Sequence, residues 1–301
     1  MTTSLNPPGS GYRFRPAHLQ SPVPLDEVLH SANAGFIVHR SAQICNEFRE
    51  EGLHFAAQMV ELINPVAVGA VSVFLYEELF GTHNRLHWML HLKQPNDYSR
   101  LLDMVDHDQK WREVADMDRL PTKGGGGWDR IFVEGTIAET VMCPQHGLGH
   151  GDDHHHDTFQ PAAMYQTALP PERLLHSANS AVTVHRTYQA RYGVREEARL
   201  FLYEWAGYVN ESLDGRATAF LYEEMWGRQD RLHLLIHLSS LEAYGRLLDL
   251  VDHDAGMHDL LGRQWVPTFK GGGGWQRLFI DGSIAETVLV PRHRSDADSA
   301  Q

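Results

Sequence analysis

The sequence is poor in cysteine and has no long apolar run. Cys45 and Cys143 are its only two cysteines among 301 residues, too few for a disulfide framework or a four-thiolate zinc site. No stretch stays apolar over the roughly 20 residues that a membrane-spanning helix needs. The N-terminal residues, MTTSLNPPGSGYRFRP, also lack the apolar core of a secretion signal. These absences predict a cytoplasmic protein without a membrane partner.

Positive charge is scarce as well. The chain has 26 lysines and arginines against 39 aspartates and glutamates, a formal net charge of -13, and no basic stripe. Long-range repulsion by such a chain disfavours nucleic acid and anionic membranes as partners. We therefore expect a small-molecule ligand rather than a polyanion.

What the sequence does contain is an internal duplication. HSANAGFIVHR (30–40) matches HSANSAVTVHR (176–186), and FLYEELFG from Phe74 matches FLYEEMWG from Phe220, both at an offset of 146. The segments KGGGGWDRIFVEG and KGGGGWQRLFIDG match at an offset of 147. The duplication predicts five parts: an N-terminal extension (1–29), repeat one (30–144), a His- and Asp-rich linker (145–175), repeat two (176–291) and a C-terminal tail (292–301).

Each repeat has the pattern of a ferredoxin-like unit. Apolar residues alternate in GFIVHR, AVSVFLYEELF and RLHWMLHL, as in strands, and recur at helical spacing after the first and third of these segments. RIFVEGTIAETV predicts two more strands around a Glu-Gly turn. The order is βαββαβ plus an extra strand. Because the helices cover only one face of each sheet, we predict an α+β protein whose repeats pack sheet to sheet as an intramolecular pseudo-dimeric α/β barrel.

This arrangement resembles the dimeric α/β-barrel superfamily in tandem-duplicated form. That superfamily includes antibiotic-biosynthesis monooxygenases, haem-degrading monooxygenases and chlorite-dismutase-like haem proteins. A duplicated chain of this length is also similar to the oxygenases that hydroxylate aromatic polyketides, the fredericamycin type. The resemblance lies in element order and length over both repeats. It implies an oxygenase and transfers no catalytic residue to this chain.

Strand alternation assigns side chains to the two faces of each sheet. In RLHWMLHL, Leu86, Trp88 and Leu90 share the face that should pack on the helices, and the histidines share the other. The predicted catalytic bases are the inward histidines His39, His87, His91, His185, His233 and His237. The predicted substrate-binding residues on the strands are Phe74, Tyr76, Glu78, Phe220, Tyr222 and Glu224.

A cavity lined by such residues suits a flat aromatic guest. Rings can stack on it, and an imidazole that titrates near neutrality can accept a proton from a phenol. The alternative is that each histidine is a hydrogen-bonded residue of the core.

The same histidines raise the question of a metal site. His87 and His91 are four residues apart on one strand, which separates them by roughly 13 Å. They cannot share an ion, so a metal would need ligands from several strands. The candidate sets are His39, His87 or His91 with Glu78, and the counterparts His185, His233 or His237 with Glu224.

The glycine runs are not phosphate cradles. A strand-like WDRIFV, not a helix, follows KGGGGW, so neither nucleotide-binding fingerprint applies. We interpret the glycines as a hinge. Lys123 and Trp128, with Lys270 and Trp275, would then close over a planar anionic substrate at the cavity mouth. The alternative is that each Trp plugs an end of the barrel.

Two further polar clusters are predicted to be solvated. The linker stretch HGLGHGDDHHHD would be a hydrated connection rather than a metal site. Acidic residues end the second helix of each repeat, among them Asp108 and Asp254, where they oppose the helix dipole.

With these features, the resemblance implies an oxygenase, a hydroxylase or monooxygenase, that acts on a polycyclic aromatic, polyketide-derived substrate in secondary-metabolite biosynthesis. Its partners would be that small molecule and O2, with a second copy of the chain as a candidate. No tightly bound cofactor is expected, and reduced flavin as co-substrate or a metal ion stays open. The alternatives are a metal-dependent enzyme and a non-catalytic protein that binds an aromatic or haem-like ligand.

Overall fold

The computed structural model describes residues 14–147 and 157–294. The first repeat contains β1 (Phe36–Gln43), α1 (Arg49–Val66), β2 (Val71–Phe80), β3 (Arg85–Leu92), α2 (Pro95–His107), α3 (Gln109–Asp116) and β4 (Ala138–Pro144). The second contains β5 (Val182–Gln189), α4 (Arg195–Ser212), β6 (Ala217–Met225), β7 (Arg231–Leu238), α5 (Leu241–His253), α6 (Ala255–Gly262) and β8 (Ala285–Pro291). The linker residues His150 and His154 to His156 lie outside the described residues.

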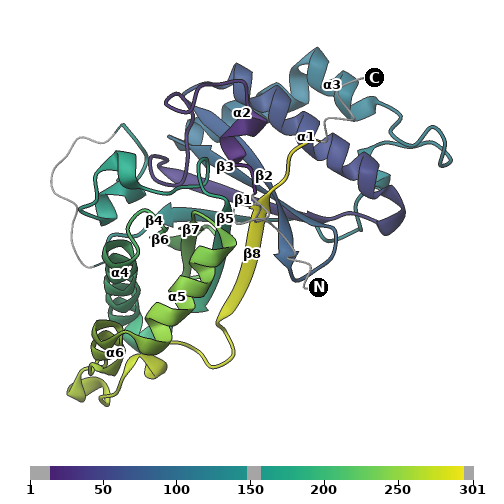
Figure 1. Cartoon of the computed structure of the whole chain (residues 1–301). Coiled ribbons are helices and arrows are strands. Elements are labelled where there is room, and N and C mark those ends of the chain that lie inside the picture. Colours follow the sequence, from purple (N-terminus) through teal and green to yellow (C-terminus); the bar gives the residue numbers. More distant parts are fainter. Residues whose placement is uncertain (1–13, 148–156, 295–301) are drawn as a thin grey trace, which may run out of the picture.

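The eight strands form one closed barrel, so the predicted architecture is confirmed. Their order around the barrel is β1-β3-β2-β8-β5-β7-β6-β4. The last strand of each repeat joins the two repeats, because β8 pairs with β5 and also with β2, and β4 pairs with β1 and also with β6. Figure 1 shows α1 to α3 outside one half of the barrel and α4 to α6 outside the other.

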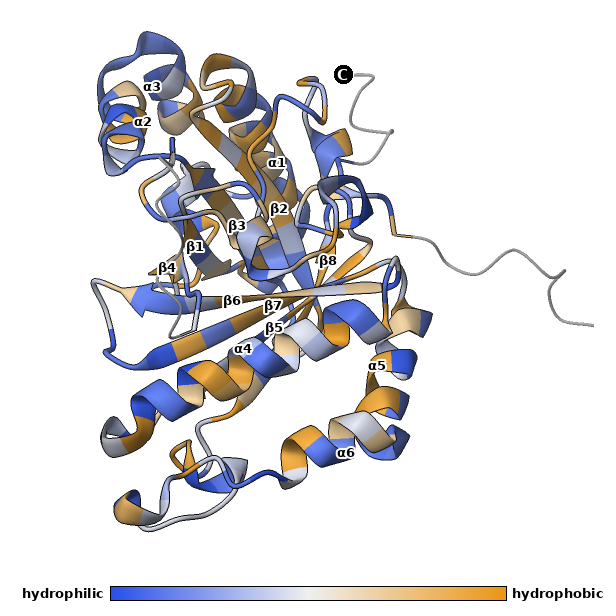
Figure 2. Cartoon of the chain, turned by 90° about the vertical axis from the view of Figure 1, so that its left-hand side faces the viewer, coloured by the Kyte–Doolittle hydropathy of each residue, from blue (hydrophilic) through white to orange (hydrophobic). Residues whose placement is uncertain are grey.

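Strand alternation separates three cores as the sequence predicts. Val73, Leu75 and Trp88 face outward and pack with α1, whereas Phe74, Tyr76 and Met89 fill the barrel interior. A third cluster repeats the outer core under α4. The outer helices carry both apolar and polar residues, as expected for helices with one face on a sheet and one in solvent (Figure 2). Within the described residues, no helix has both the length and the apolarity to cross a membrane.

The last hairpin of each repeat is not formed. Residues 128–130 form a 3-10 turn, and Phe132 makes only an isolated bridge to Ile44, so the segment before β4 contributes no strand. An additional helix, α3, occupies the preceding segment. Its N-cap is Asp108, whose carboxylate accepts from the amide of Lys110. The acidic residue that seemed misplaced at the end of α2 thus starts the next helix, and Asp254 does the same for α6.

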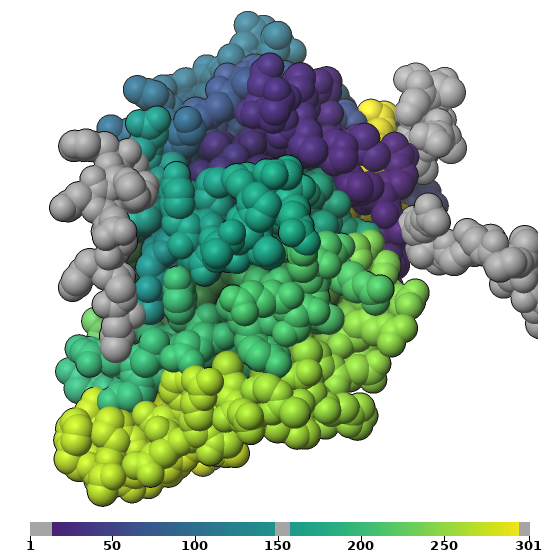
Figure 3. All heavy atoms as spheres, turned by 60° about the vertical axis from the view of Figure 1, so that its left-hand side comes forward, coloured from purple at the N-terminus to yellow at the C-terminus, as the bar shows by residue number. Residues whose placement is uncertain are grey.

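The segments before β1 and β5 close one end of the barrel. They lie side by side (Figure 3), with the amide of His18 donating to Ala178 and that of Met164 donating to Ala32. Gln20 binds the backbone N and O of Leu75, and Gln166 binds Leu221 in the same way. Gln20 and Gln166 are 146 positions apart, so the duplication extends upstream of the predicted start at residue 30.

Candidate active site

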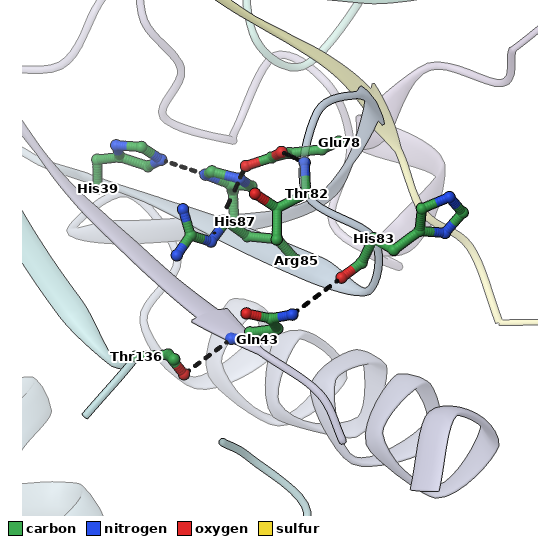
Figure 4. Close-up of polar contacts among 8 residues, drawn as sticks. All are labelled: His39, Gln43, Glu78, Thr82, His83, Arg85, His87 and Thr136. Carbon is green, nitrogen blue, oxygen red and sulfur yellow. Dashed lines mark hydrogen bonds and ion pairs between the residues drawn. The ribbon is translucent and has the colours of Figure 1, made fainter. Parts of the chain in front are cut away.

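Three side chains from three strands form a hydrogen-bonded chain inside the barrel. Tyr76 and His87 are opposite each other on β2 and β3, which brings Glu78, two residues further on the same face, beside His87. On the other side of β3, Ser41 of β1 is opposite His87, and His39 lies diagonally next to it. The register of three antiparallel strands therefore places Glu78, His87 and His39 in a row (Figure 4).

The hydrogen bonds in this row indicate which ring nitrogens carry a hydrogen. His87 Nε2 lies 3.1 Å from Glu78 Oε1, and His87 Nδ1 lies 2.8 Å from His39 Nε2. The other carboxylate oxygen of Glu78 accepts from the amide of Thr82 at 2.5 Å, which fixes the side chain to the β2–β3 turn. An ionised Glu78 accepts from His87 Nε2, so His87 Nδ1 accepts from His39 Nε2. His39 then keeps a free lone pair on Nδ1.

The second repeat builds the same row less tightly. His185 Nε2 lies 2.9 Å from His233 Nδ1, but His233 Nε2 is 3.7 Å from Glu224 and has no hydrogen-bond partner among the described residues. The rings of His39 and His185 meet edge to face with centroids 5.0 Å apart. Two glutamates and four imidazoles thus cross the barrel from one repeat to the other.

Burial determines the charge state of the row. The pKa of His39 is held well below its ordinary value, mainly by burial and then by the neighbouring His87 and His233, and that of His185 is lowered in the same way. Burial alone would raise the pKa of Glu78, but the hydrogen bonds from His87 and the Thr82 amide outweigh it, and the pKa is lowered. Near neutral pH the row therefore holds an ionised glutamate and a neutral His39.

The Glu78 end of the row opens on a groove. The groove has a volume of about 700 Å³ and lies between the β2–β3 turn and the end of β8. Its walls are partly apolar, with Phe14, Leu79 and Phe80, and partly charged, with Arg49 and Glu77 beside Glu78. A carboxylate backed by imidazoles therefore meets a partly apolar groove.

His91 and His237 are not part of the row. Each is fully buried in another layer of the barrel, where His91 Nε2 lies 2.9 Å from Ser177 Oγ and His237 Nε2 lies 2.8 Å from Ser31 Oγ. Burial lowers the pKa of each of them to about 3. They are hydrogen-bonded core residues that connect the two repeats.

The predicted aromatic cavity is filled by its own side chains. Phe74, Phe220, Tyr76 and Tyr222 have no exposed surface and belong to the interior core. The tyrosine hydroxyls donate to the backbone carbonyls of the opposite repeat, Tyr76 to Ser177 at 2.6 Å and Tyr222 to Ser31 at 2.5 Å. These four residues pack together in the interior core. They are not among the residues that line the groove.

The glycine loops lie outside the barrel. Trp128 stacks on Phe55 of α1 with centroids 6.2 Å apart, and Lys123 pairs with Glu51 at 2.7 Å. In the second repeat, Trp275 stacks on Phe201 of α4, and Lys270 pairs with Glu197 at 2.7 Å. The loops are thus anchored to the helix layer, and the structure does not bring these residues to the histidine rows.

Among the described residues, no three His, Cys, Asp or Glu side chains are placed to hold a metal ion. The imidazoles of the row bind one another instead.

Four residues of the barrel interior are missing from the sequence prediction. Ser31 and Ser177 hold His237 and His91, while His30 and His176 stack on each other with centroids 3.5 Å apart. Their signal is the segment HSAN, which both repeats contain at the same place. This segment precedes the first strand of each repeat, so strand alternation does not predict which way its side chains point.

Two solved structures share the fold over nearly the whole chain. A "putative monooxygenase" from Fusobacterium nucleatum is 8% identical, with a TM-score of 0.51, over 88% of this chain and 93% of that one. A "putative monooxygenase" from Lactobacillus acidophilus is 8% identical, with a TM-score of 0.52, over 86% and 94%. An anthrone oxidase-like protein is 10% identical, with a TM-score of 0.45, over 88% and 94%. At such identities the likeness concerns the fold alone.

Fold and site together define a class of protein: a duplicated α/β barrel with paired Glu-His-His rows inside. The chain belongs to the family of unknown function DUF6039, whose model matches residues 9–297. No curated protein matches the sequence.

Proposed function

We propose that the protein is an oxygenase whose substrate is a polycyclic aromatic, polyketide-derived phenol or anthrone of secondary metabolism. One observation carries the proposal: Glu78, at the end of the Glu78–His87–His39 row, is among the residues that line the groove. The fold is also shared with proteins named as monooxygenases, which supports the class of reaction.

The groove offers both kinds of contact that a flat phenol needs. Phe14, Leu79 and Phe80 supply apolar surface for the rings, and Arg49, whose Nη1 lies 2.6 Å from Glu77 Oε1, adds a cation to the lining. Phe80 is 59% exposed and so is accessible to a guest. Glu78 is fixed by the Thr82 amide and need not reorganise when a proton arrives.

In the proposed reaction, Glu78 takes a proton from the activated C–H of the substrate. The hydrogen bond from His87 Nε2, which the His39–His87 contact orients, holds the carboxylate in place, and the proton stays on Glu78 until it returns. The carbanion gives one electron to O2, the two radicals combine, and the proton returns to the resulting peroxide. Loss of water leaves a quinone, so anthrone and O2 yield anthraquinone and water without an external reductant. Reduced flavin as co-substrate is an alternative electron donor.

The experiment follows O2 uptake and quinone absorbance with anthrone as substrate. Glu78→Gln keeps the shape of the side chain but cannot accept the proton, and His87→Asn interrupts the row. Both changes should lower kcat by about 10²–10⁴-fold, the usual contribution of a general base. Glu224→Gln is the matched control, because it makes the same change in the looser row of the second repeat.

The outcomes separate three cases. If Glu78→Gln loses turnover and Glu224→Gln keeps it, the reaction takes place in the first repeat. If Glu78→Gln and Glu224→Gln each lose part of the turnover to the same extent, both repeats carry it out. Full turnover in folded Glu78→Gln and His87→Asn proteins would refute the proposed base.

A further inference from the structure

The barrel interior opens to solvent at the end where β4 and β8 begin. The inward-facing side chains of β4 become more buried with depth, because Ala138 is exposed, Thr140 is half-buried and Met142 is fully buried. The inward-facing side chains of β8 repeat this gradient from an exposed Ala285 to a fully buried Leu289. The opposite end of the barrel is the one closed by the segments before β1 and β5.

His39 lies at the inner limit of this open end. Its side chain is half-buried, whereas Ile37, the next inward-facing residue of β1 toward the closed end, is fully buried. His39 Nε2 binds His87. His39 Nδ1 makes no hydrogen bond within the described part of the chain and is not one of its fully buried unpaired atoms. The free lone pair on Nδ1 therefore has accessible surface inside the barrel.

Three hydroxyl groups share the inner face with this lone pair. Thr140 is directly opposite His39 in the register of β1 and β4, and Ser41 follows His39 on the same face. Thr287 is opposite His185, whose ring meets that of His39. All three hydroxylated side chains are half-buried, and none makes a side-chain hydrogen bond to residues 14–147 or 157–294. They can donate hydrogen bonds to a ligand or accept them from it.

The charged side chains at the open end occur in pairs. Arg85 Nε lies 4.0 Å from Glu78 Oε1, and Arg231 Nε lies 3.9 Å from Glu224 Oε2. A charged ligand would lose its hydration here without gaining an unbalanced counter-charge. A neutral ligand loses less hydration and so fits this end better.

The rim of the open end is apolar. Ile137 and Ile284 directly precede the two inward-facing alanines and are 48% and 44% exposed. Ala138 and Ala285 themselves are small, so they leave space above the histidines. An apolar body with one polar tip matches an apolar rim above a polar floor.

We infer that the open end of the barrel is a binding site for a small neutral phenol, whose hydroxyl donates to His39 Nδ1 and whose ring lies at the level of Ala138 and Ala285. His39 Nε2 already donates to His87, so the ligand has to bring the hydrogen of the new bond. The site is separate from the groove at Glu78, whose lining contains neither alanine. The inference does not rest on the proposed oxygenase reaction.

The test is calorimetric titration of the full chain with phenol and, separately, with anisole, which has the same ring but no hydroxyl hydrogen. Phenol should bind with a dissociation constant of about 10 mM or less, and anisole about tenfold more weakly, because it leaves the His39 lone pair unpaired. Ala138→Leu and Ala285→Leu fill the space above the histidines, and each should weaken phenol binding about tenfold or more. Ala115→Leu is the matched control, because it makes the same change at an exposed position of α3, outside the barrel. It should leave the dissociation constant as in the wild type.

Phe80→Ala distinguishes the open end from the groove, because Phe80 lines the groove. Phenol should bind to this variant as it binds to the wild type. The inference is overturned if Phe80→Ala weakens phenol binding while both alanine replacements leave it unchanged, since the phenol then binds in the groove. It is also overturned if anisole binds as tightly as phenol, or if phenol gives no heat of binding at about 10 mM. The measurement needs no turnover, so its failure is distinct from failure of the proposed reaction.

Discussion

Ser31 and Ser177 exchange hydrogen bonds between the two repeats. The amide of Ser31 donates to Ser177 Oγ at 2.9 Å, and the amide of Ser177 donates to Ser31 Oγ at 3.0 Å. Both residues are completely buried, and each hydroxyl also holds a histidine of the barrel interior. One reciprocal pair thus positions the repeats against each other and fixes two buried imidazoles.

Ser177→Ala should therefore be strongly destabilising. The change leaves the Ser31 amide and His91 Nε2 without partners in a buried site, at about 1–3 kcal/mol for each unpaired group. Denaturant unfolding followed by circular dichroism measures the loss. Ser239→Ala, at an exposed position, is the control and should change the free energy of unfolding by less than about 0.5 kcal/mol. Equal effects of the two changes would contradict the role of the serine pair.

Stability should fall as the pH falls below about 6.5. His91, His176 and His237 are buried, and burial lowers the pKa of each to about 3. Between their unfolded pKa of about 6.5 and pH 3 the unfolded state binds more protons, so their contribution is complete above this window and is lost within it. Each histidine adds a slope of about 1.4 kcal/mol per pH unit.

Replacement of one of these histidines tests that slope. His237→Gln should reduce the dependence of the free energy of unfolding on pH by about one proton between pH 6 and 4. Urea unfolding at a series of pH values gives the slope for both proteins. A slope identical to that of the wild type would mean that His237 takes up its proton in the folded state.

Trp275→Ala separates the two interpretations of the glycine loop. The ring stacks on Phe201 with an interplanar angle of 5°. Loss of this stacking should lower the free energy of unfolding by about 0.5–1.5 kcal/mol, in addition to the effect of the lost apolar burial. If the loop is a structural anchor, the folded variant keeps its anthrone turnover. A large fall in kcat with little loss of stability would instead support a lid over the substrate.

Two glycine substitutions should change the free energy of unfolding in opposite directions. Gly245 lies inside α5, and a Cβ there meets nothing within 4 Å, so Gly245→Ala should stabilise the protein by about 0.5–1 kcal/mol. Gly273 has φ 124°, and a Cβ would lie 2.4 Å from Arg277 Cδ. Gly273→Ala should cost about 1–3 kcal/mol. Thermal unfolding of both variants checks the signs, and stabilisation by Gly273→Ala would contradict the strained geometry.

The fold could be predicted because alternation and duplication are local signals. The alternation in RLHWMLHL alone assigns Trp88 to the outer face of the sheet and His87 to the inner face. The matching segment of the second repeat gives the same assignment. The additional helix α3 escaped prediction because Asp108 ends one helix and caps the next, and only the second role makes its charge favourable.

The site was predictable only in part. Alternation places His39, His87 and Glu78 on the inner face, and the strand spacing correctly separates His87 from His91. Alternation cannot say whether an inner face encloses space, because that depends on how large side chains such as Tyr76 fit against the other repeat. Contacts between the repeats, such as Ser31 with Ser177, depend on a register that no local pattern encodes.

Because β4 and β8 each pair with strands of both repeats, the barrel does not close within one repeat. A polypeptide ending after β4 would leave the outer backbone edges of β2 and β4 without the partners that β8 and β6 provide. Such a fragment is expected to be aggregation-prone or to pair with a copy of itself, since open strand edges seek other strands. We therefore expect that the protein cannot be divided at the boundary between the repeats.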